Sequence, residues 1–147
     1  MLSWREVDFA GVVLAGFVGG YIMAMAGLWA SRIPGLAAID IADFGRRYMA
    51  SDRPSAWILG MVSHLINSVL LTLVWAMAIA PAFHLPRVVS AVLWGEVLAI
   101  VWAGGLIAPM AGLGFLGRKT RSHRFALTSA LLHAIWGLII GLLYVPK

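Results

Sequence analysis

Two histidines are the strongest candidates for chemistry in this chain. His64 and His133 each lie inside a long apolar segment, about 12 Å from the segment's beginning at 1.5 Å per residue. Neutral imidazole is a good ligand for haem iron or a metal, and it can pass protons, so a buried intramembrane histidine is a functional candidate. The alternative is structural, because such a histidine can also join two helices by a hydrogen bond.

Two further polar residues fall inside apolar segments. Asn67 continues the helical stripe that begins at His64, and Glu96 is the acidic residue set deepest in an apolar run. If the third span begins near Leu93, Glu96 lies at the outer interface close to Arg87 and His84, where we expect an interfacial partner. An ion or proton site is the alternative.

The residues that position these groups form transmembrane helices. Of 147 residues, 62% are hydrophobic and only 12% are charged, whereas soluble domains carry roughly a quarter charged residues. A helix of about 20 apolar residues crosses the hydrocarbon core, and four runs are long enough, at about 9–30, 56–79, 88–116 and 126–145. We predict an all-α membrane protein, a single transmembrane domain over 1–147.

Several kinds of chemistry are disfavoured. The chain has no cysteine, which excludes disulfides and thiolate catalysis, and two histidines fall short of the three or four ligands that zinc takes. The net charge of +5 comes from loop residues beside apolar spans, so we expect no nucleic-acid partner. No nucleophile elbow, phosphate-binding loop or metalloprotease helix is present. We therefore do not expect an enzyme.

An internal repeat is the most informative pattern. FVGGYIMAMAGL at 17–28 matches WAGGLIAPMAGL at 102–113, and HLINSVLLTLVW at 64–75 aligns more weakly with HAIWGLIIGLLY at 133–144. Each repeat (about 9–80 and 88–145) holds two spans, so the halves are parallel repeats about an axis along the membrane normal. This alignment places His64 and His133 at similar depth, where they could face each other.

Glycines within the spans are expected to pack helices together, because small residues let helices approach closely in lipid. Gly19/Gly20 and Gly104/Gly105 are predicted to mark the contact between the halves. The other predicted packing positions are Gly16, Gly27, Gly112, Gly137 and Gly141. Pro109 has no counterpart in the first repeat, so it should kink the third helix or open a cavity on one side only.

Basic residues predict the orientation. The first connection holds Arg32, Arg46, Arg47 and Arg53, the last holds Arg118, Lys119, Arg121 and Arg124, and the opposite side has only Arg5, Arg87 and Lys147. The positive-inside rule puts both basic loops in the cytoplasm and both termini outside. The first loop also mixes apolar and charged residues, which suits a short interfacial helix. A catalytic role for Asp40 and Asp43 is a minor alternative there.

A glycine-rich first span ending in AGL, an IDIA segment, a second span with an early histidine and a last span reading HAIWGLIIGLLY resemble a group of small bacterial four-span membrane proteins of unknown function. The resemblance covers most of the chain, although the loop after AGL is longer here. It implies a four-helix bundle in the bacterial inner (cytoplasmic) membrane without an assigned activity.

Three functions fit these patterns. The first is a small integral membrane accessory subunit, without a cofactor, that packs against partner membrane proteins or its own copies among membrane lipids. The second is a membrane electron carrier that binds haem b through His64 and His133, or that reacts with quinones. The third is a small transporter or channel subunit, which the scarcity of charged residues along the spans disfavours.

Overall fold

The computed structural model describes residues 6–120 and 122–146, and these residues form helices and connecting turns without strands. Four helices are long and apolar enough to cross a membrane: Phe9–Arg32, Pro54–Phe83, Arg87–Met110 and Arg124–Leu143. Their outer faces expose large apolar side chains, such as Leu14, Ile66 and Val101, as expected for contact with lipid. The prediction of an all-α protein with four helices long and apolar enough to span a membrane is confirmed for the described residues.

The spans are made of the following segments. The first contains α1 (Phe9–Trp29) and the short 3₁₀ turn η1 (Ala30–Arg32), and the second contains α3 (Pro54–Val74), η2 (Trp75–Ile79) and α4 (Ala80–Phe83). The third contains α5 (Arg87–Leu98), η3 (Ala99–Ile107) and α6 (Ala108–Met110), and the fourth is α7 (Arg124–Leu143). The loops carry α2 (Asp43–Met49) and the 3₁₀ segment η4 (Phe115–Thr120).

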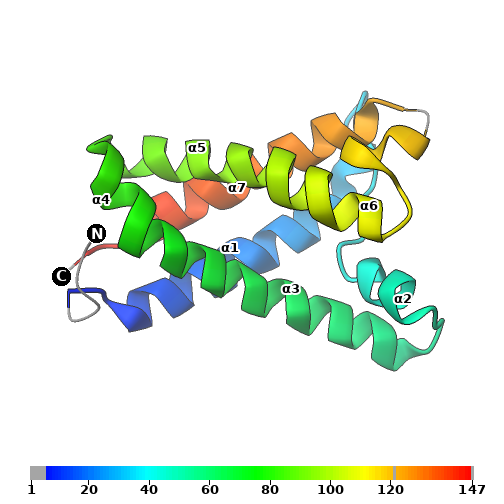
Figure 1. Ribbon diagram of the computed structural model, residues 1–147, viewed down its shortest axis with the longest axis horizontal. Helices are drawn as coiled ribbons and strands as arrows, with labels where there is room; N and C mark the ends of the chain where they lie inside the picture. The colour runs from blue at the N-terminus through cyan, green and yellow to red at the C-terminus, as the bar shows by residue number, and fades with distance from the viewer. Residues whose placement is uncertain (1–5, 121, 147) are drawn as a thin grey trace.

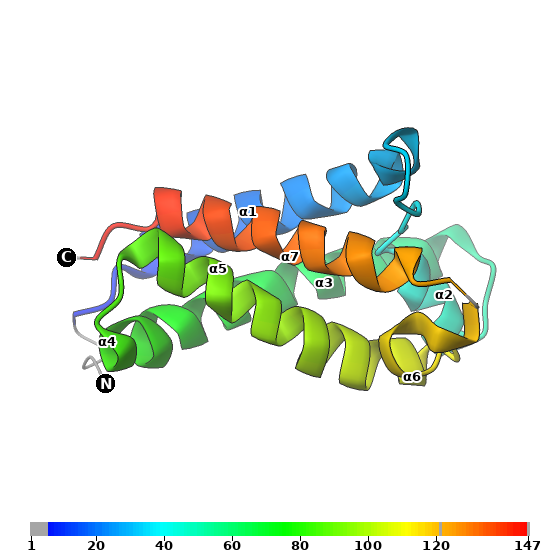
Figure 2. The same cartoon turned by 90° about the horizontal axis from the view of Figure 1, so that it is seen from above.

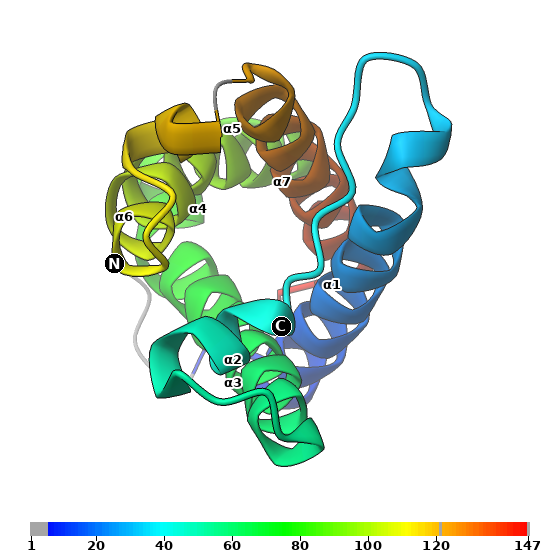
Figure 3. The same ribbon diagram turned by 90° about the vertical axis from the view of Figure 1, so that its right-hand side faces the viewer.

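The four spans form a ring. Viewed along the bundle, their order is α3, α1, α7, α5 (Figure 3), with close packing between α1 and α3, α1 and α7, and α5 and α7. The start of α1, the end of α7 and the turn from α4 to α5 lie at one end of the bundle (Figures 1 and 2), and α2 and α6 lie at the other. Between α3 and the third span, close contact is limited to the end near η2 and α4.

Glycines set the close helix contacts. A Cβ on Gly16 would lie 2.7 Å from Val69 Cα of α3, and a Cβ on Gly137 would lie 2.7 Å from Val92 Cα of α5. Gly20 and Gly141 repeat these approaches one turn along, against Ser68 and Val88. Each small-xxx-small pair is therefore used inside the bundle, where it brings two backbones together.

The two halves do not pack in the register of the sequence repeat. The repeat aligns Ser68 with Gly137 and Gly20 with Gly105. Ser68 does pack against Gly20, but Gly137 packs against Ala91, and Gly105 is exposed. The arrangement of the chain as two parallel two-helix repeats thus stays a prediction, and these helix contacts differ between the halves.

Two spans contain wide π-helical turns just before a proline. η2 ends two residues before Pro81, and η3 ends two residues before Pro109. Proline lacks an N–H and clashes with the carbonyl four residues earlier in a regular α-helix, so a wider turn accommodates it. The first span, which the sequence repeat pairs with the third, has neither a proline nor a π-helical turn. Pro109 therefore accompanies a distortion of the third span that the first span lacks, as predicted.

The end near the α4–α5 turn is closed by buried aromatic residues. Trp75 is fully buried and meets Tyr144 edge-on, with ring centroids 5.7 Å apart. Its Nε1 donates to Ser90 Oγ at 3.2 Å. Trp75 lies near the end of a span, where tryptophans often contact the lipid interface, but its ring fills the bundle interior instead.

The first loop folds back over the opposite end. Ile39 N donates to Gly27 O at 2.9 Å, and Ala37 N donates to Thr128 Oγ1 at 2.9 Å, which joins the loop to α1 and α7. The Asp40 carboxylate accepts from the backbone N–H of Ala42 and from Trp57 Nε1. Asp40 therefore has a structural task, since it starts the turn into α2 and holds it to α3.

Candidate functional site

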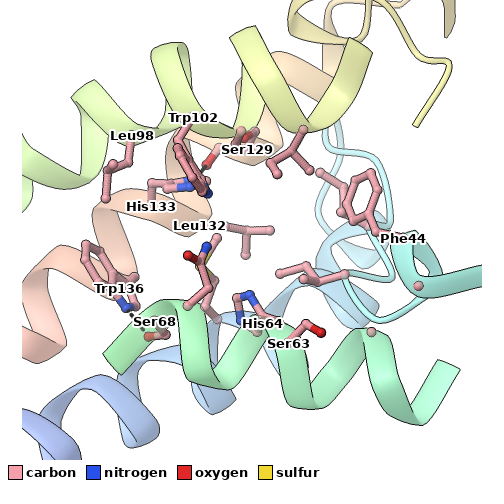
Figure 4. A pocket seen from close by; sticks show the side chains of 18 of the residues that line it. Phe44, Ser63, His64, Ser68, Leu98, Trp102, Ser129, Leu132, His133 and Trp136 are labelled. Atoms are coloured by element: carbon pink, nitrogen blue, oxygen red, sulfur yellow. Dashed lines mark hydrogen bonds between the residues drawn. The ribbon is translucent and has the colours of Figure 1, made fainter. Parts of the chain in front are cut away.

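A cavity of about 500 Å³ lies inside the bundle at the end covered by α2. Its walls come from α3, η3, α7 and α2 (Figure 4), and both His64 and His133 line it. Other residues of the lining include Phe44, Tyr48, Ser63, Asn67, Ser68, Trp102, Ala103, Ser129 and Trp136.

The cavity wall is mainly apolar and aromatic. Its polar side chains are hydroxyls, imidazoles, one amide and the N–H groups of tryptophans, and no charged side chain belongs to the described lining. Cavities of roughly 300–1,000 Å³ with apolar walls and a few polar groups are typical sites for small apolar ligands. The composition disfavours a path for ions, which need oxygen rings or charges along the route.

The cavity lies where the ring of helices is least closely packed. Glycines draw α1 onto α3 and α7 onto α5, whereas α3 and η3 face each other without close packing. The π-helical turns of η3 present Trp102 and Ala103 to the cavity. Close packing on three sides therefore leaves the fourth side, between α3 and η3, for the cavity.

His133 is held in a defined orientation. It is only 8% exposed, and its Nδ1 lies 2.7 Å from Ser129 O on the preceding turn of α7. A carbonyl oxygen can only accept, so Nδ1 carries the proton and donates. Its Nε2 has no hydrogen-bond partner among the described residues. Figure 4 shows this ring at the cavity wall, which Trp102 also lines.

His64 is positioned differently. Its Nε2 lies 3.0 Å from Gly20 O of α1, so Nε2 donates this hydrogen bond and joins α3 to α1. The two histidines therefore share one cavity, as the sequence suggested, but they have different partners. In this arrangement His64 forms the interhelical hydrogen bond that was the structural alternative.

Two linked hydrogen bonds join three helices at the part of the cavity wall formed by Trp136 and Ser68. Trp136 Nε1 donates to Ser68 Oγ at 2.6 Å, and Ser68 Oγ donates to Gly16 O at 2.6 Å. Figure 4 shows the bond between Trp136 and Ser68. These bonds connect α7, α3 and α1 immediately below the cavity.

α2 forms the roof of the cavity. Phe44 and Tyr48 line the cavity from above and stack with ring centroids 6.3 Å apart. Gly45 of α2 and Gly60 of α3 meet backbone to backbone, where neither position has room for a Cβ. On the other side, Tyr48 Oη donates to Ile107 O at 3.4 Å, and burial raises the pKa of this phenol. The roof is thus packed tightly on α3 and bonded weakly to η3.

Three of the glycines predicted to pack helices do not do so. Gly104 contacts Leu116 of the following turn instead of the other repeat, and Gly105 is exposed. Gly112 has φ +78° and open space around it, because the helix has already ended at Met110. By contrast, Gly19 contacts Trp136, and Gly27 contacts the backbone of the first loop.

Glu96 does not have the interfacial partner that was expected. Arg87 Nε donates to Gly141 O at 2.8 Å, and the ion pairs among the described residues join Asp43 to Arg46 and to Arg47. Glu96 is partly buried on α5 and does not line the cavity. The expected interfacial partner is therefore not found among the described residues, and Arg87, which lies at a similar depth, reaches across to α7 instead.

Some cavity residues had no signal in the sequence. Phe44, Tyr48 and Trp102 line the cavity, but nothing in the sequence ties them to the histidines. Trp102 Nε1 is buried and has no hydrogen-bond partner among the described residues. A buried donor of this kind is uncommon and marks a position that favours an acceptor.

Haem with two histidine ligands takes one ring nitrogen from each histidine. Since Nε2 of His64 donates to Gly20 O and Nδ1 of His133 donates to Ser129 O, the nitrogens left for such a ligand are Nδ1 of His64 and Nε2 of His133. Haem ligation by these two residues stays a prediction. Within the described residues, no group of three or more His, Asp or Glu side chains comes together as a metal site.

Comparison with known protein families, curated proteins and solved structures finds no match to this chain.

Proposed function

We propose that this chain is a multi-pass membrane protein that binds an apolar small molecule in its internal cavity. The observation that carries the proposal is the cavity of about 500 Å³ inside the bundle, with apolar walls and a few polar groups. The cavity is partly open, and its apolar walls lack close van der Waals partners when no apolar molecule lies against them. A bound apolar molecule would supply these van der Waals contacts. Elsewhere in the bundle, glycines bring the helices into close contact and leave no such space.

The molecule reaches the cavity from the bilayer. α3 and η3 do not pack closely on each other, and the outer faces beside them carry Leu59 and Leu106, which are suited to lipid. An apolar ligand dissolved in the membrane would pass between these helices without crossing water. The weak contact of Tyr48 with Ile107 closes the same side from above.

The hypothesis of an accessory subunit has less support than the proposal that the cavity binds a ligand. It relied on small residues available for partner helices, but Gly16, Gly20, Gly137 and Gly141 are used inside the bundle. The proposal therefore places binding in the interior and assigns the outer surface to lipid. A reaction with quinones remains compatible with this proposal as one choice of ligand.

We further propose that the end covered by α2 faces the cytoplasm of a bacterial cell, with α2 at the interface and both termini outside. Described basic residues gather at that end: Arg32, Arg46, Arg47, Arg53, Arg118, Lys119 and Arg124. The positive-inside rule supports this orientation. Arg5, Arg121 and Lys147, which also entered the expectation, lie outside the described residues.

Filling the cavity tests the proposal. Ala103 lines the cavity, whereas Val101, two residues away on η3, is 64% exposed on the outer face. Protein purified gently from its membranes should carry an apolar molecule that is visible by native mass spectrometry. Ala103→Phe should lose the molecule, and Val101→Phe should keep it. A molecule retained by Ala103→Phe, or absent from the wild-type protein, would reject the cavity as its site.

A further inference from the structure

We infer that the ligand carries a hydroxyl group and that His133 Nε2 accepts the hydrogen of that hydroxyl. This inference rests on the proposed function and names the chemistry that the cavity recognises. It follows from the tautomer of His133, from the Trp102 donor that lines the same cavity and from the depth of His133 in the membrane.

The tautomer of His133 is determined by its partner. Nδ1 lies 2.7 Å from Ser129 O, which can only accept, so the ring proton is on Nδ1. In a neutral imidazole, Nε2 then holds a lone pair and can only accept. A charged ring would need a counter-ion in these surroundings, and no acidic side chain belongs to the described cavity lining. The cavity therefore offers an acceptor at His133.

The cavity wall also holds a donor, Trp102 Nε1, which needs an acceptor, whereas His133 Nε2 needs a donor. Trp102 Nε1 is buried without a hydrogen-bond partner among the described residues, and Trp102 and His133 line the same cavity (Figure 4). Leaving such a donor unpaired is costly, so a ligand oxygen that pairs with it would be favoured. A hydroxyl group both donates and accepts, so it suits a cavity whose wall holds the acceptor His133 Nε2 and the donor Trp102 Nε1. A ketone, ester or ether oxygen only accepts, and so satisfies one of the two.

The depth of the site excludes a charged headgroup. His133 is the tenth residue of α7, which begins at Arg124, so it lies ~14 Å along the helix from that basic end. A phospholipid headgroup would have to leave the interface to reach it, at a large desolvation cost. The ligand is thus a neutral lipid alcohol or a hydroquinone, which share the hydroxyl on an apolar body.

The test uses matched ligand pairs on the full-length protein. Geranylgeraniol and its methyl ether differ at the hydroxyl, and decylhydroquinone and decylquinone differ in the same chemistry under anaerobic conditions. Binding is followed in detergent by quenching of tryptophan fluorescence, because Trp102 and Trp136 line the cavity. The hydroxyl-bearing member should bind about tenfold more tightly, the factor expected for one buried hydrogen bond.

The histidine variants identify the acceptor. His133→Leu should bind both members of a pair equally, whereas His123→Leu, at an exposed position before α7, should keep the wild-type preference. A preference in the geranylgeraniol pair alone identifies a lipid alcohol, and a preference in the quinone pair alone identifies a hydroquinone. Either supports the inference.

Two results would oppose it in distinguishable ways. Equal binding of both members in both pairs by the wild-type protein would overturn the hydroxyl inference and leave the binding function in place. No binding of any of the four molecules would count against the binding function itself. The comparison on wild-type protein decides the point even if His133→Leu fails to fold.

Discussion

Trp136 on α7 donates to Ser68 on α3 at 2.6 Å, and Ser68 passes the connection to Gly16 O on α1 at 2.6 Å. We expect Ser68→Ala and Trp136→Phe each to destabilise the bundle by about 1–2 kcal/mol, because each leaves a buried polar group unpaired. In a double-mutant cycle the two changes should couple by roughly 0.6–1.7 kcal/mol, the range for intramembrane hydrogen bonds. Unfolding in mixed micelles measures both values. Additive effects would show that this bond contributes nothing.

The contact at Gly20 should not tolerate a larger side chain. A Cβ there would lie 2.8 Å from Ser68 Cβ, so Gly20→Val would force α1 away from α3. We expect a loss of about 2 kcal/mol or more from overpacking. Ala10→Val on the exposed face of α1 is the matched control and should change stability by less than about 0.5 kcal/mol. Equal effects of the two variants would contradict the observed packing.

Substitution of His64 should lower the free energy of unfolding and leave the visible absorption spectrum of the protein unchanged. Its Nε2 donates to Gly20 O at 3.0 Å, and His64→Ala should cost about 1 kcal/mol, measured by unfolding in micelles. The purified protein should show no haem bands in a reduced-minus-oxidised spectrum. Haem bands that vanish in His64→Ala and in His133→Ala would restore the cytochrome hypothesis, since both ligands would then be required.

Tyr48 should control how fast the ligand leaves. Its Oη donates to Ile107 O at 3.4 Å, the weak side of the roof, so Tyr48→Phe should release a bound ligand several-fold faster in stopped-flow displacement. Burial raises the pKa of Tyr48 above its ordinary value of 10.0. The wild-type rate should therefore stay constant up to pH 10 and rise above the folded-state pKa, where the phenol ionises. Tyr48→Phe should lack this rise; a rise of equal size would assign it to another group.

Orientation can be tested with single cysteines because the chain contains none. Asp52 and His123 are exposed at the end near α2, and His84 is exposed at the opposite end. An impermeant thiol reagent should label Asp52→Cys and His123→Cys only in inverted vesicles, and His84→Cys only in right-side-out vesicles. Labelling of all three on one side would be incompatible with the bundle, whereas a reversed pattern would invert the orientation alone.

The sequence predicted the spans well because hydrophobic length is a local property. All four helices could be located from runs of apolar residues, and the histidines could be identified as polar groups inside them. The cavity could not be predicted, because it depends on the gap between α3 and η3, which are far apart in the chain. The roles of the two histidines differ for the same reason: His64 meets Gly20 from another span, whereas His133 meets Ser129 on its own helix.

The repeat also shows the limit of pattern matching in apolar helices. Gly19 and Gly104 occupy equivalent positions in similar strings, yet Gly19 contacts Trp136 on a neighbouring span and Gly104 contacts Leu116 in the next turn. In lipid, packing depends on which small residues align across two helices. Identical residues in two similar sequence motifs can therefore make different contacts when one of the two helices widens into π-helical turns.

The π-helical segment η3 from Ala99 to Ile107 has a consequence for how this chain can change its length. A wide turn holds more residues than an α-helical turn over the same rise, so it resembles the trace of an insertion that the span has absorbed. Deleting a single residue between 99 and 107 would tighten one turn and rotate Trp102 relative to His133, while α5 and its contacts with α7 stay in register. The regular α-helices α5 and α7 have no extra residue to lose. A deletion within either helix would rotate every later residue of that helix away from its contacts on the adjacent helix. Length variants of this fold should therefore be tolerated in η3 and η2, and the shape of the cavity should vary with them.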